Sequence, residues 1–232
     1  MADILTSLSS VTALPIFGIA VAFIFFFLAK LLTRRFDTPL VNPLIISVFF
    51  IWGFYIFLEI PMENFNAGGN IILLFLPLAT AALAVSMYEK RHLIKKAFLP
   101  IIIGTVVGVI VSVSSVLILC KVFGISQDIT MSLFPKSVTS AIALPLAEEL
   151  GGYSAIASAG VFVTGVFGAI MCPYFIKWFK IDNPIAAGLG IGASCHALGT
   201  TQAIKLGRTE GATSGIAIGL CGLLTVIASL FL

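Results

Sequence analysis

The chain is dominated by long apolar runs, which are separated by short stretches that carry most of the charged residues. The first run, residues 11–32, gives 22 mostly apolar positions. As a helix at about 1.5 Å per residue, it spans the roughly 30 Å hydrocarbon core of a bilayer. Asp, Glu, Lys and Arg make up 10% of the 232 residues, against about 25% in an average soluble domain, which is too few to cover a soluble globule. We therefore predict an all-α polytopic membrane protein.

Six apolar runs have the length of a transmembrane helix, and we expect six spans. They lie at residues 11–32, 40–60, 70–88, 98–122, 155–178 and 212–232. Residues 64–69, which read NFNAGG, have the composition of a turn between the second and third spans. No linker or low-complexity segment divides the chain, so a single integral membrane domain over residues 1–232 is expected.

Two further stretches, residues 131–150 and 185–206, are rich in Ser, Thr, Gly and Ala and contain ionisable groups. Pro135 and Pro145 interrupt the helical hydrogen-bond ladder in the first stretch, and the glycines of the second are expected to do the same through their flexibility. Irregular backbone is tolerated inside a membrane only where protein or a water-filled cavity satisfies it. We predict that both stretches are broken or re-entrant segments and that together they form the functional site.

Basic residues indicate the orientation of the chain. They gather in three short loops and at the exit of the second broken segment: Lys30, Arg34, Arg35, Lys90, Arg91, Lys95, Lys96, Lys177, Lys180, Lys205 and Arg208. Short loops rich in Lys and Arg stay on the cytoplasmic side of a membrane. All of these loops are cytoplasmic only if residues 131–150 enter and leave on the outer face and residues 185–206 on the inner face. Both termini are then outside.

An internal similarity supports this topology. Residues 139–148, TSAIALPLAE, resemble residues 80–89, TAALAVSMYE, and a third copy begins at His196. The repeated unit is a broken segment followed by a span. If this unit crosses the membrane a net single time, the second and third copies are inverted relative to each other, which is the usual architecture of secondary transporters. The first copy departs from this pattern, because its broken segment is expected to span fully.

The first broken segment holds candidate ligands for an anion around Lys136. A buried ammonium is costly unless it is paired or hydrated, so Lys136 either serves as the counter-charge of an anionic substrate or extends to the outer interface. The hydroxyls of Ser137, Thr139 and Ser140 can bind carboxylate oxygens, although Ser and Thr also serve as contacts between helices. Glu148 is either a proton carrier or a residue that faces water at the end of a helix.

The second broken segment holds His196 among small and hydroxyl-bearing residues: Ser194, Gly199, Thr200 and Thr201. The ordinary pKa of histidine suits a proton carrier or a substrate ligand. A lone histidine in an apolar protein is more often a structural hydrogen bonder, but an ionisable group among glycines inside a membrane favours a function.

Other classes of function find no support in the sequence. The basic residues form no stripe that could follow phosphates, so no nucleic acid partner is expected. The four cysteines lie in apolar stretches without the spacing of a metal or redox site, so we expect buried thiols and predict neither a metal nor a cofactor. No enzyme motif is present, and no enzyme is predicted. The pairs Gly104/Gly108 and Gly215/Gly219 favour close helix contacts, within a protomer or in the homodimer that we expect.

Several motifs resemble the LrgB/CidB family: TPLVNPLIIS, IPMENFNAGG, SLFPKSVTSAIA, EELGG and His196-x-x-Gly199-Thr200. They occur in family order over about residues 35–232. By position, the resemblance implicates Asn42, Lys136, Ser137, Thr139, Ser140, His196, Gly199 and Thr200. The family's usual Ser-His pair is here Cys195-His196, with Ser194 one step earlier, and Ala141 stands where proline is expected. These departures bear on the substrate more than on the fold.

The resemblance implies one of two functions in the bacterial cytoplasmic membrane. Family members are described as antiholin-like proteins or murein hydrolase regulators, the plant branch is the plastidial glycolate/glycerate translocator, and bacterial relatives are linked to small organic acids such as pyruvate. We predict a proton-coupled secondary transporter of small monocarboxylates that works by alternating access. The alternative is a holin-like or antiholin-like regulator of murein hydrolase activity and lysis, which acts with a small LrgA/CidA-like membrane partner.

Overall fold

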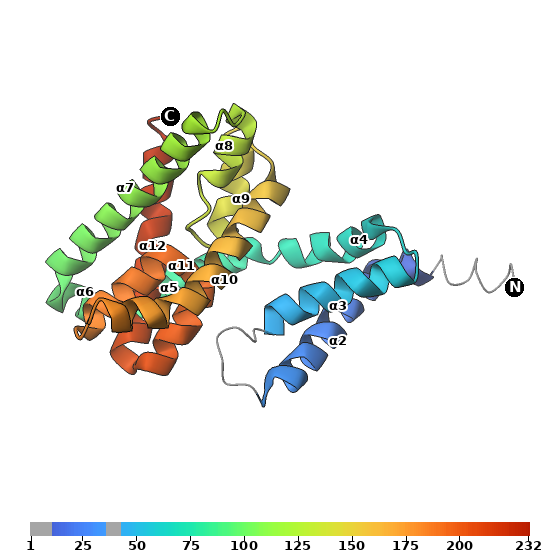
Figure 1. The fold of residues 1–232 in the computed structure, drawn as a ribbon, viewed down its shortest axis with the longest axis horizontal. Coiled ribbons are helices and arrows are strands. Elements are labelled where there is room, and N and C mark those ends of the chain that lie inside the picture. The colour runs from blue at the N-terminus through green and yellow to red at the C-terminus, as the bar shows by residue number, and fades with distance from the viewer. Residues whose placement is uncertain (1–10, 36–42) are drawn as a thin grey trace, which may run out of the picture. The chain divides into compact units, whose positions relative to one another are not determined.

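The computed structural model describes residues 11–35 and 43–232, and within these ranges every regular element is a helix. Four of the described helices are long and apolar enough to cross a membrane: Pro15–Thr33, Phe98–Val122, Ser154–Trp178 and Arg208–Ser229. The predicted all-α polytopic class is confirmed. The chain divides into two compact units, Met1–Pro77 and Leu78–Leu232 (Figure 1). The expected single membrane domain stays a prediction.

The first unit contains α2 (Pro15–Thr33), α3 (Pro43–Phe57) and α4 (Met62–Leu73). Helix α2 packs against both of the others, and the rings of Phe25 and Phe54 bring α2 and α3 together with centroids 5.2 Å apart. The 15 residues of α3 give a length of about 22 Å, less than the roughly 30 Å of a bilayer core. The span predicted at residues 40–60 is therefore helical over a shorter stretch than expected.

The turn expected at residues 64–69 is wrong, because this stretch lies inside α4. Of its two glycines, Gly68 serves close packing instead of a turn. A Cβ on Gly68 would lie 2.8 Å from the backbone nitrogen of Ile19, and one on Gly18 would lie 2.9 Å from the carbonyl oxygen of Phe65. Glycine at both positions therefore allows the backbones of α2 and α4 to touch, as small residues do between membrane helices.

The continuous third span predicted at residues 70–88 is also wrong. Helix α4 ends at Leu73, and α5 (Leu76–Glu89) begins after a turn. In a continuous helix, the ring of Pro77 would clash with the carbonyl oxygen of Leu73, four residues earlier. The other spans agree better with the structure: residues 98–122 form α7 (Phe98–Val122), and residues 155–178 and 212–232 correspond to α10 (Ser154–Trp178) and α12 (Arg208–Ser229). The short α6 (Arg91–Lys96) precedes α7.

In the second unit, the first predicted broken segment folds as a helical hairpin of α8 (Gln127–Leu133) and α9 (Ser140–Glu149). Turns occupy residues 134–137, around Pro135, and a bend at Val138 leads into α9; Pro145 lies inside α9 without ending it. Tyr153, which follows α9, contacts α8: its side chain hydrogen-bonds Asp128 at the start of α8, and its backbone N–H donates to Ser132 Oγ at 2.7 Å. The segment therefore enters and leaves on the same side.

The second predicted broken segment is α11 (Pro184–Leu206), which is interrupted at His196, where φ is 42° and ψ is −137°. Contacts with α12 show that the chain reverses there. In the first arm, Gly188 faces Glu210 and Thr213 of α12. Gly192, four residues later, faces Ser214 and Ala217, which also lie later in α12, so this arm is parallel to α12. Along the second arm the order is opposite: Thr200 bonds Ser214, and then Ile204 meets Gly211. The two arms are therefore antiparallel, and the break falls at the histidine instead of at a glycine.

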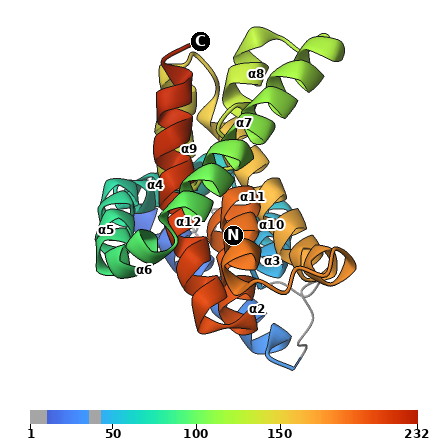
Figure 2. The same cartoon turned by 90° about the vertical axis from the view of Figure 1, so that its left-hand side faces the viewer.

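The two hairpins open toward opposite ends of the second unit. The first arm of α11 begins beside the start of α7, where Ala97, Ile101, Leu189 and Ile216 form a buried cluster. Basic residues flank this end: Lys95, Lys96, Lys177, Lys180, Lys205 and Arg208. We call it the basic end. The hairpin of α8 and α9 follows the far end of α7, and Figures 1 and 2 show α8 and the C-terminus at the opposite end from α6. This is the inverted relation that the sequence similarity predicted.

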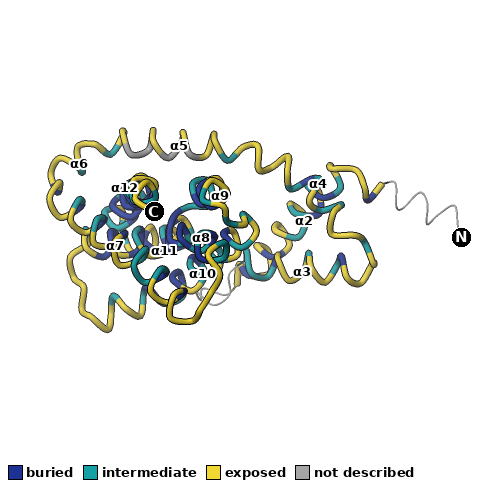
Figure 3. Tube along the Cα trace, turned by 90° about the horizontal axis from the view of Figure 1, so that it is seen from above, coloured by how far each residue is buried: buried dark blue, intermediate teal, exposed yellow. Residues whose placement is uncertain are grey.

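Burial follows the same architecture. Buried residues of the second unit gather on α7 and on α9 to α12, whereas α5 is mostly exposed (Figure 3). The centre of the unit is therefore the region in which the two hairpins lie.

Candidate functional site

The tips of both hairpins meet α10 near one residue, Val161. Its side chain packs with Val138 of the first hairpin, and its carbonyl oxygen accepts a hydrogen bond from His196 Nε2 of the second hairpin at 2.9 Å. On the other side of the first tip, Ser112 Oγ of α7 donates to Ser137 Oγ at 2.7 Å. The two interruptions of the backbone therefore lie at one level, between α7 and α10.

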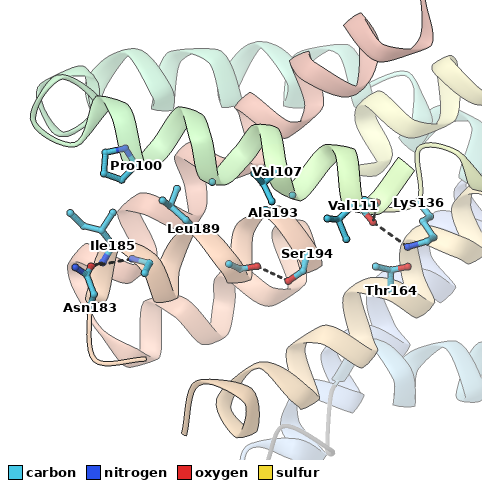
Figure 4. Close-up of a pocket in the computed structure, with 16 residues that line it drawn as sticks. Pro100, Val107, Val111, Lys136, Thr164, Asn183, Ile185, Leu189, Ala193 and Ser194 are labelled. Atoms are coloured by element: carbon cyan, nitrogen blue, oxygen red, sulfur yellow. Dashed lines mark hydrogen bonds between the residues drawn. The ribbon is translucent and has the colours of Figure 1, made fainter. Parts of the chain in front are cut away.

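A cavity of about 670 Å³ leads to this level from the basic end. Helix α7 lines it over residues 100–112, and the first arm of α11 with its N-cap lines it over residues 183–194. Figure 4 shows Asn183 at one end of the cavity and Lys136 and Thr164 at the other. The far half of α7 contributes no lining residue, so this cavity stops at the hairpin tips.

Lys136 is the cation at the inner end of the cavity. Its Nζ donates to Ser137 Oγ at 3.3 Å, and no carboxylate of the described ranges lies within ion-pair distance of it. Because Ser112 and Lys136 both donate to the Ser137 oxygen, the hydroxyl hydrogen of Ser137 is left for another acceptor. Thr164 and Ser194 add two more hydroxyls. A cluster that offers an ammonium and hydroxyl donors without a carboxylate suits an anion, since charge-assisted hydrogen bonds are the strong ones.

A second cavity, of about 510 Å³, lies between α10 and the first arm of α11 and shares Lys136, Thr164 and Ser194 with the first. Along α10 it extends from Val163 to Ile176, again toward the basic end. Both cavities therefore approach the same ammonium from the same side.

His196 occupies a different place from the one expected of a substrate ligand. It is 3% exposed and lines neither of these two cavities. Because the Val161 carbonyl oxygen only accepts, His196 Nε2 carries the hydrogen and donates it. A Cβ on Gly165 would lie 2.9 Å from the same ring nitrogen, so glycine leaves room for the imidazole. These contacts fasten the second tip to α10, and proton coupling through His196 stays a prediction.

The structure brings together only part of the predicted site. Of the predicted residues, Lys136, Ser137 and Ser194 line the larger cavity. Thr139 is the N-cap of α9 and Ser140 its first residue, and neither lines the two cavities.

The remaining candidates lie around the second hairpin or away from the cavities. Thr200 Oγ1 donates to the His196 carbonyl oxygen at 2.9 Å and lies 2.7 Å from Ser214 Oγ. A Cβ on Gly199 would meet Ile191 Cγ2 at 3.0 Å, so this glycine allows the two arms of α11 to pack closely. Thr201 and Glu148 are exposed, and Asn42 lies outside the described residues.

Sequence reasoning missed three polar lining residues: Ser112, Thr164 and Asn183. Asn183 had a usable signal, because Asn followed by Pro at the start of a helical run is typical of an N-cap. Its Oδ1 accepts from the backbone N–H groups of Ile185 and Ala186 at 2.9 and 3.2 Å. Ser112 and Thr164 are hydroxyl residues inside apolar spans, where nothing in the sequence distinguishes them from packing contacts.

Comparisons with known proteins agree with this architecture. The model of the LrgB-like family matches residues 22–232. The "Antiholin-like protein LrgB" of Bacillus cereus (strain B4264) is 35% identical over 222 residues, which cover 93% of this chain and 94% of the relative. No solved structure matches the chain. The family predicted from the order of the motifs is confirmed, and the chain belongs to the LrgB-like family of membrane proteins.

Proposed function

We propose that this protein is a secondary transporter of the bacterial cytoplasmic membrane that carries a small organic anion with one carboxylate, such as glycolate, glycerate or pyruvate. The observation that carries the proposal is a cavity that enters from the basic end and stops at Lys136, beside two hairpin tips. Alternating access requires a site near the middle of the protein that opens to one side at a time. Proton coupling, through His196 or Glu148, belongs to the same proposal.

The chemistry of the cavity supports a monocarboxylate. One ammonium balances one carboxylate, and the hydroxyls of Ser137 and Thr164 are within the same lining. The walls between Lys136 and the basic end are mostly apolar, with Pro100, Val107 and Leu189 among them (Figure 4). A second carboxylate would be held against these walls without a partner, at the cost of burying an unpaired charge.

The charge distribution supports access from the cytoplasm in the described conformation. Loops rich in Lys and Arg stay inside, and the basic end is the end from which both cavities approach Lys136. The conformation is therefore inward-facing in this proposal, and the outward-facing state requires the cavity to close there and open at the other end.

The test is uptake of C2 to C4 acids by purified protein in liposomes, with wild type beside Lys136→Met. Methionine keeps an unbranched side chain of similar length and removes the charge. A hydrogen bond to a charged group contributes about 1.5–3 kcal/mol, so we expect the half-saturation concentration to rise about tenfold to a hundredfold. Lys136→Arg keeps the charge, so its half-saturation concentration should rise less than that of Lys136→Met.

The matched control is Lys121→Met. Lys121 lies in the last turn of α7, exposed and remote from the lining of both cavities. We expect its half-saturation concentration to equal that of the wild type. Wild-type uptake by the Lys136→Met protein, or equal losses in the two variants, would remove Lys136 from the binding site. Uptake that does not saturate with substrate concentration would refute the proposal that the protein is a transporter.

A second function is favoured by a separate observation, the name of the Bacillus cereus relative, "Antiholin-like protein LrgB". In this function the chain regulates murein hydrolase activity and lysis as a homo-oligomer or with a small LrgA/CidA-like membrane partner. The comparisons speak for this alternative, whereas the geometry of the cavity speaks for transport.

The two functions predict different results in vesicles and in cells. A regulator that alters permeability releases an enclosed dye without saturation and without preference for one organic acid, whereas a carrier retains the dye and saturates. Cells that lack a regulator show changed murein hydrolase activity, and a Lys136→Met protein should restore it. For a carrier whose loss affects lysis indirectly, Lys136→Met should fail to restore it.

A further inference from the structure

Two cysteines of the second unit lie side by side at the tip of the second hairpin. Cys172 belongs to α10, and Cys195 is the last residue before the break at His196. Their Sγ atoms are 3.2 Å apart, so one thiol donates to the other. All four cysteines, Cys120 and Cys221 included, are free and buried. The two cysteines are 23 residues apart in the sequence, which is why their spacing did not resemble a metal or redox site.

The pair is buried but can be reached through the smaller cavity. Cys172 is 8% and Cys195 3% exposed, and both line the space of about 510 Å³ that approaches from the basic end. Gly168, one turn before Cys172, faces Cys195, and a Cβ there would overlap the Cys195 sulfur. Ser194 Oγ, which lines both cavities, lies 2.9 Å from the same sulfur. A small reagent in the cavity therefore meets two adjacent thiols and a hydroxyl.

We propose that Cys172 and Cys195 form a reversible thiol–disulfide site. On oxidation two S–H bonds break and one S–S bond forms, while two protons and two electrons pass to a small disulfide or diazene oxidant, which is reduced. The sulfur atoms must close from 3.2 Å to about 2.05 Å. Cys195 is next to the only reversal of α11 in the described chain, so the bond ties the second tip covalently to α10.

The consequence for transport rests on the proposed function. In the reduced protein, the tip is held to α10 by the hydrogen bond from His196 to Val161 and by packing, both of which can break and re-form. A disulfide removes that freedom. The oxidised carrier is therefore fixed in one conformation, and uptake stops until a dithiol reduces the bond.

The experiment treats the full-length protein in liposomes with diamide, a diazene oxidant, and maps the digested peptides by mass spectrometry without reduction. We expect a Cys172–Cys195 peptide pair, a fall in free thiols from four to two, and full recovery with dithiothreitol. The variant Cys120→Ser keeps the pair and should cross-link like the wild type, whereas Cys172→Ser should not. Phenylarsine oxide bridges adjacent thiols and should protect the pair from diamide in the wild type. This test needs no cysteine variant, so it remains valid if a variant fails to fold.

Two further readouts separate this proposal from the transport proposal. Hydrogen exchange at residues 190–200 should slow about tenfold or more on oxidation, because local opening of the tip is prevented, and uptake should fall in parallel and recover on reduction. Absence of the Cys172–Cys195 peptide pair overturns the thiol site, and its presence with unchanged exchange overturns the fixing of the second tip to α10. If the reduced protein takes up no anion, the transport proposal fails while the peptide map and exchange still decide the thiol site.

Discussion

Two glycines in the first arm of α11 provide a direct test of how the second hairpin packs. A Cβ on Gly192 would lie 2.8 Å from Ala217 Cβ and 2.9 Å from the carbonyl carbon of Ser214, both in α12. The first is a short side chain and the second is backbone, so neither can rotate away. A Cβ on Gly190, two residues earlier in the same arm, meets nothing within 4 Å. The same substitution at both positions therefore differs only in its surroundings.

The expected magnitudes follow from these distances. Alanine in place of a helical glycine gains roughly 0.5–1 kcal/mol from conformational entropy, and this gain is common to both variants. Forcing a methyl group into a packed interface costs about 1–3 kcal/mol, and this cost falls on Gly192→Ala alone. The difference between the two variants is therefore about 1–3 kcal/mol. At about 2–4 °C per kcal/mol for a chain of this size, their melting temperatures should differ by several degrees.

The assay is thermal unfolding of the two purified variants and the wild type in one detergent, followed by far-ultraviolet circular dichroism and checked by titration with sodium dodecyl sulfate. Gly190→Ala should be as stable as the wild type or slightly more stable, and Gly192→Ala less stable than both. Equal stability of the two variants would refute the packing of the first arm of α11 on α12, and with it the reversal at His196. Uptake is unsuitable as the readout, because Gly190 lines both cavities.

Three smaller predictions concern the ends of the hairpins. Asn183→Ala removes the N-cap of α11 and should cost about 1 kcal/mol in thermal stability; Asn183→Asp should keep the cap but, with a negative charge at the cavity mouth, raise the half-saturation concentration for an anion. Hydrogen bonds from the side chains of Ser126 and then Tyr153 hold the pKa of Asp128 below its ordinary 3.8. The ionised carboxylate therefore stabilises the fold above pH 3.8, and this stability is lost as the pH falls through the lower pKa of the folded state. Below about pH 4, the unfolding midpoint of Asp128→Asn should therefore fall less steeply with pH than that of the wild type.

The sequence predicted those parts of the fold that a single physical constraint determines. The bounds of α7 agree with the prediction because an apolar run inside lipid must satisfy its own backbone and ends where Lys95, Lys96 and Lys121 can reach water. The first break was predictable from Pro135, which lies in the turn between α8 and α9. The inverted hairpins followed from the basic loops, because charge is costly to move across a membrane.

Two of the errors, the turn expected at residues 64–69 and the break expected at the glycines of residues 185–206, have a common physical origin in glycine. Composition suggests flexibility, but Gly68, Gly188 and Gly192 lie inside helices, where a missing Cβ lets another backbone approach. Whether a glycine makes the backbone flexible or allows close packing depends on the helix that lies beside it, and the sequence alone does not show which helix that is. The pair Gly104 and Gly108 is a partial exception, since close contact was expected and Leu189 and Ala193 of the same chain lie against it.

The positions of single polar residues were harder to predict for a related reason. Thr164 lines both cavities, while Thr105, which is equally isolated in an apolar span, returns its hydroxyl to the Ile101 carbonyl oxygen of its own helix at 2.8 Å. The difference is the direction in which each side chain points relative to α11. His196 shows the converse: its chemistry suggested a ligand, but the reversal of the chain turns its ring toward α10 and away from both cavities.

If the chain is a carrier, the contacts beyond Lys136 form the gate that must open next. Phe134 and Val138 are almost fully buried there, and with Ser112 and Ser137 they line a space of only about 10 Å³. The barrier consists of apolar packing and one hydroxyl–hydroxyl bond of 2.7 Å, with no ion pair among the described residues that line this space. A bond between neutral groups contributes only about 0.5–1.5 kcal/mol. Movement of the first tip away from α7 would therefore expose Ser137 and Lys136 to the opposite side at low cost.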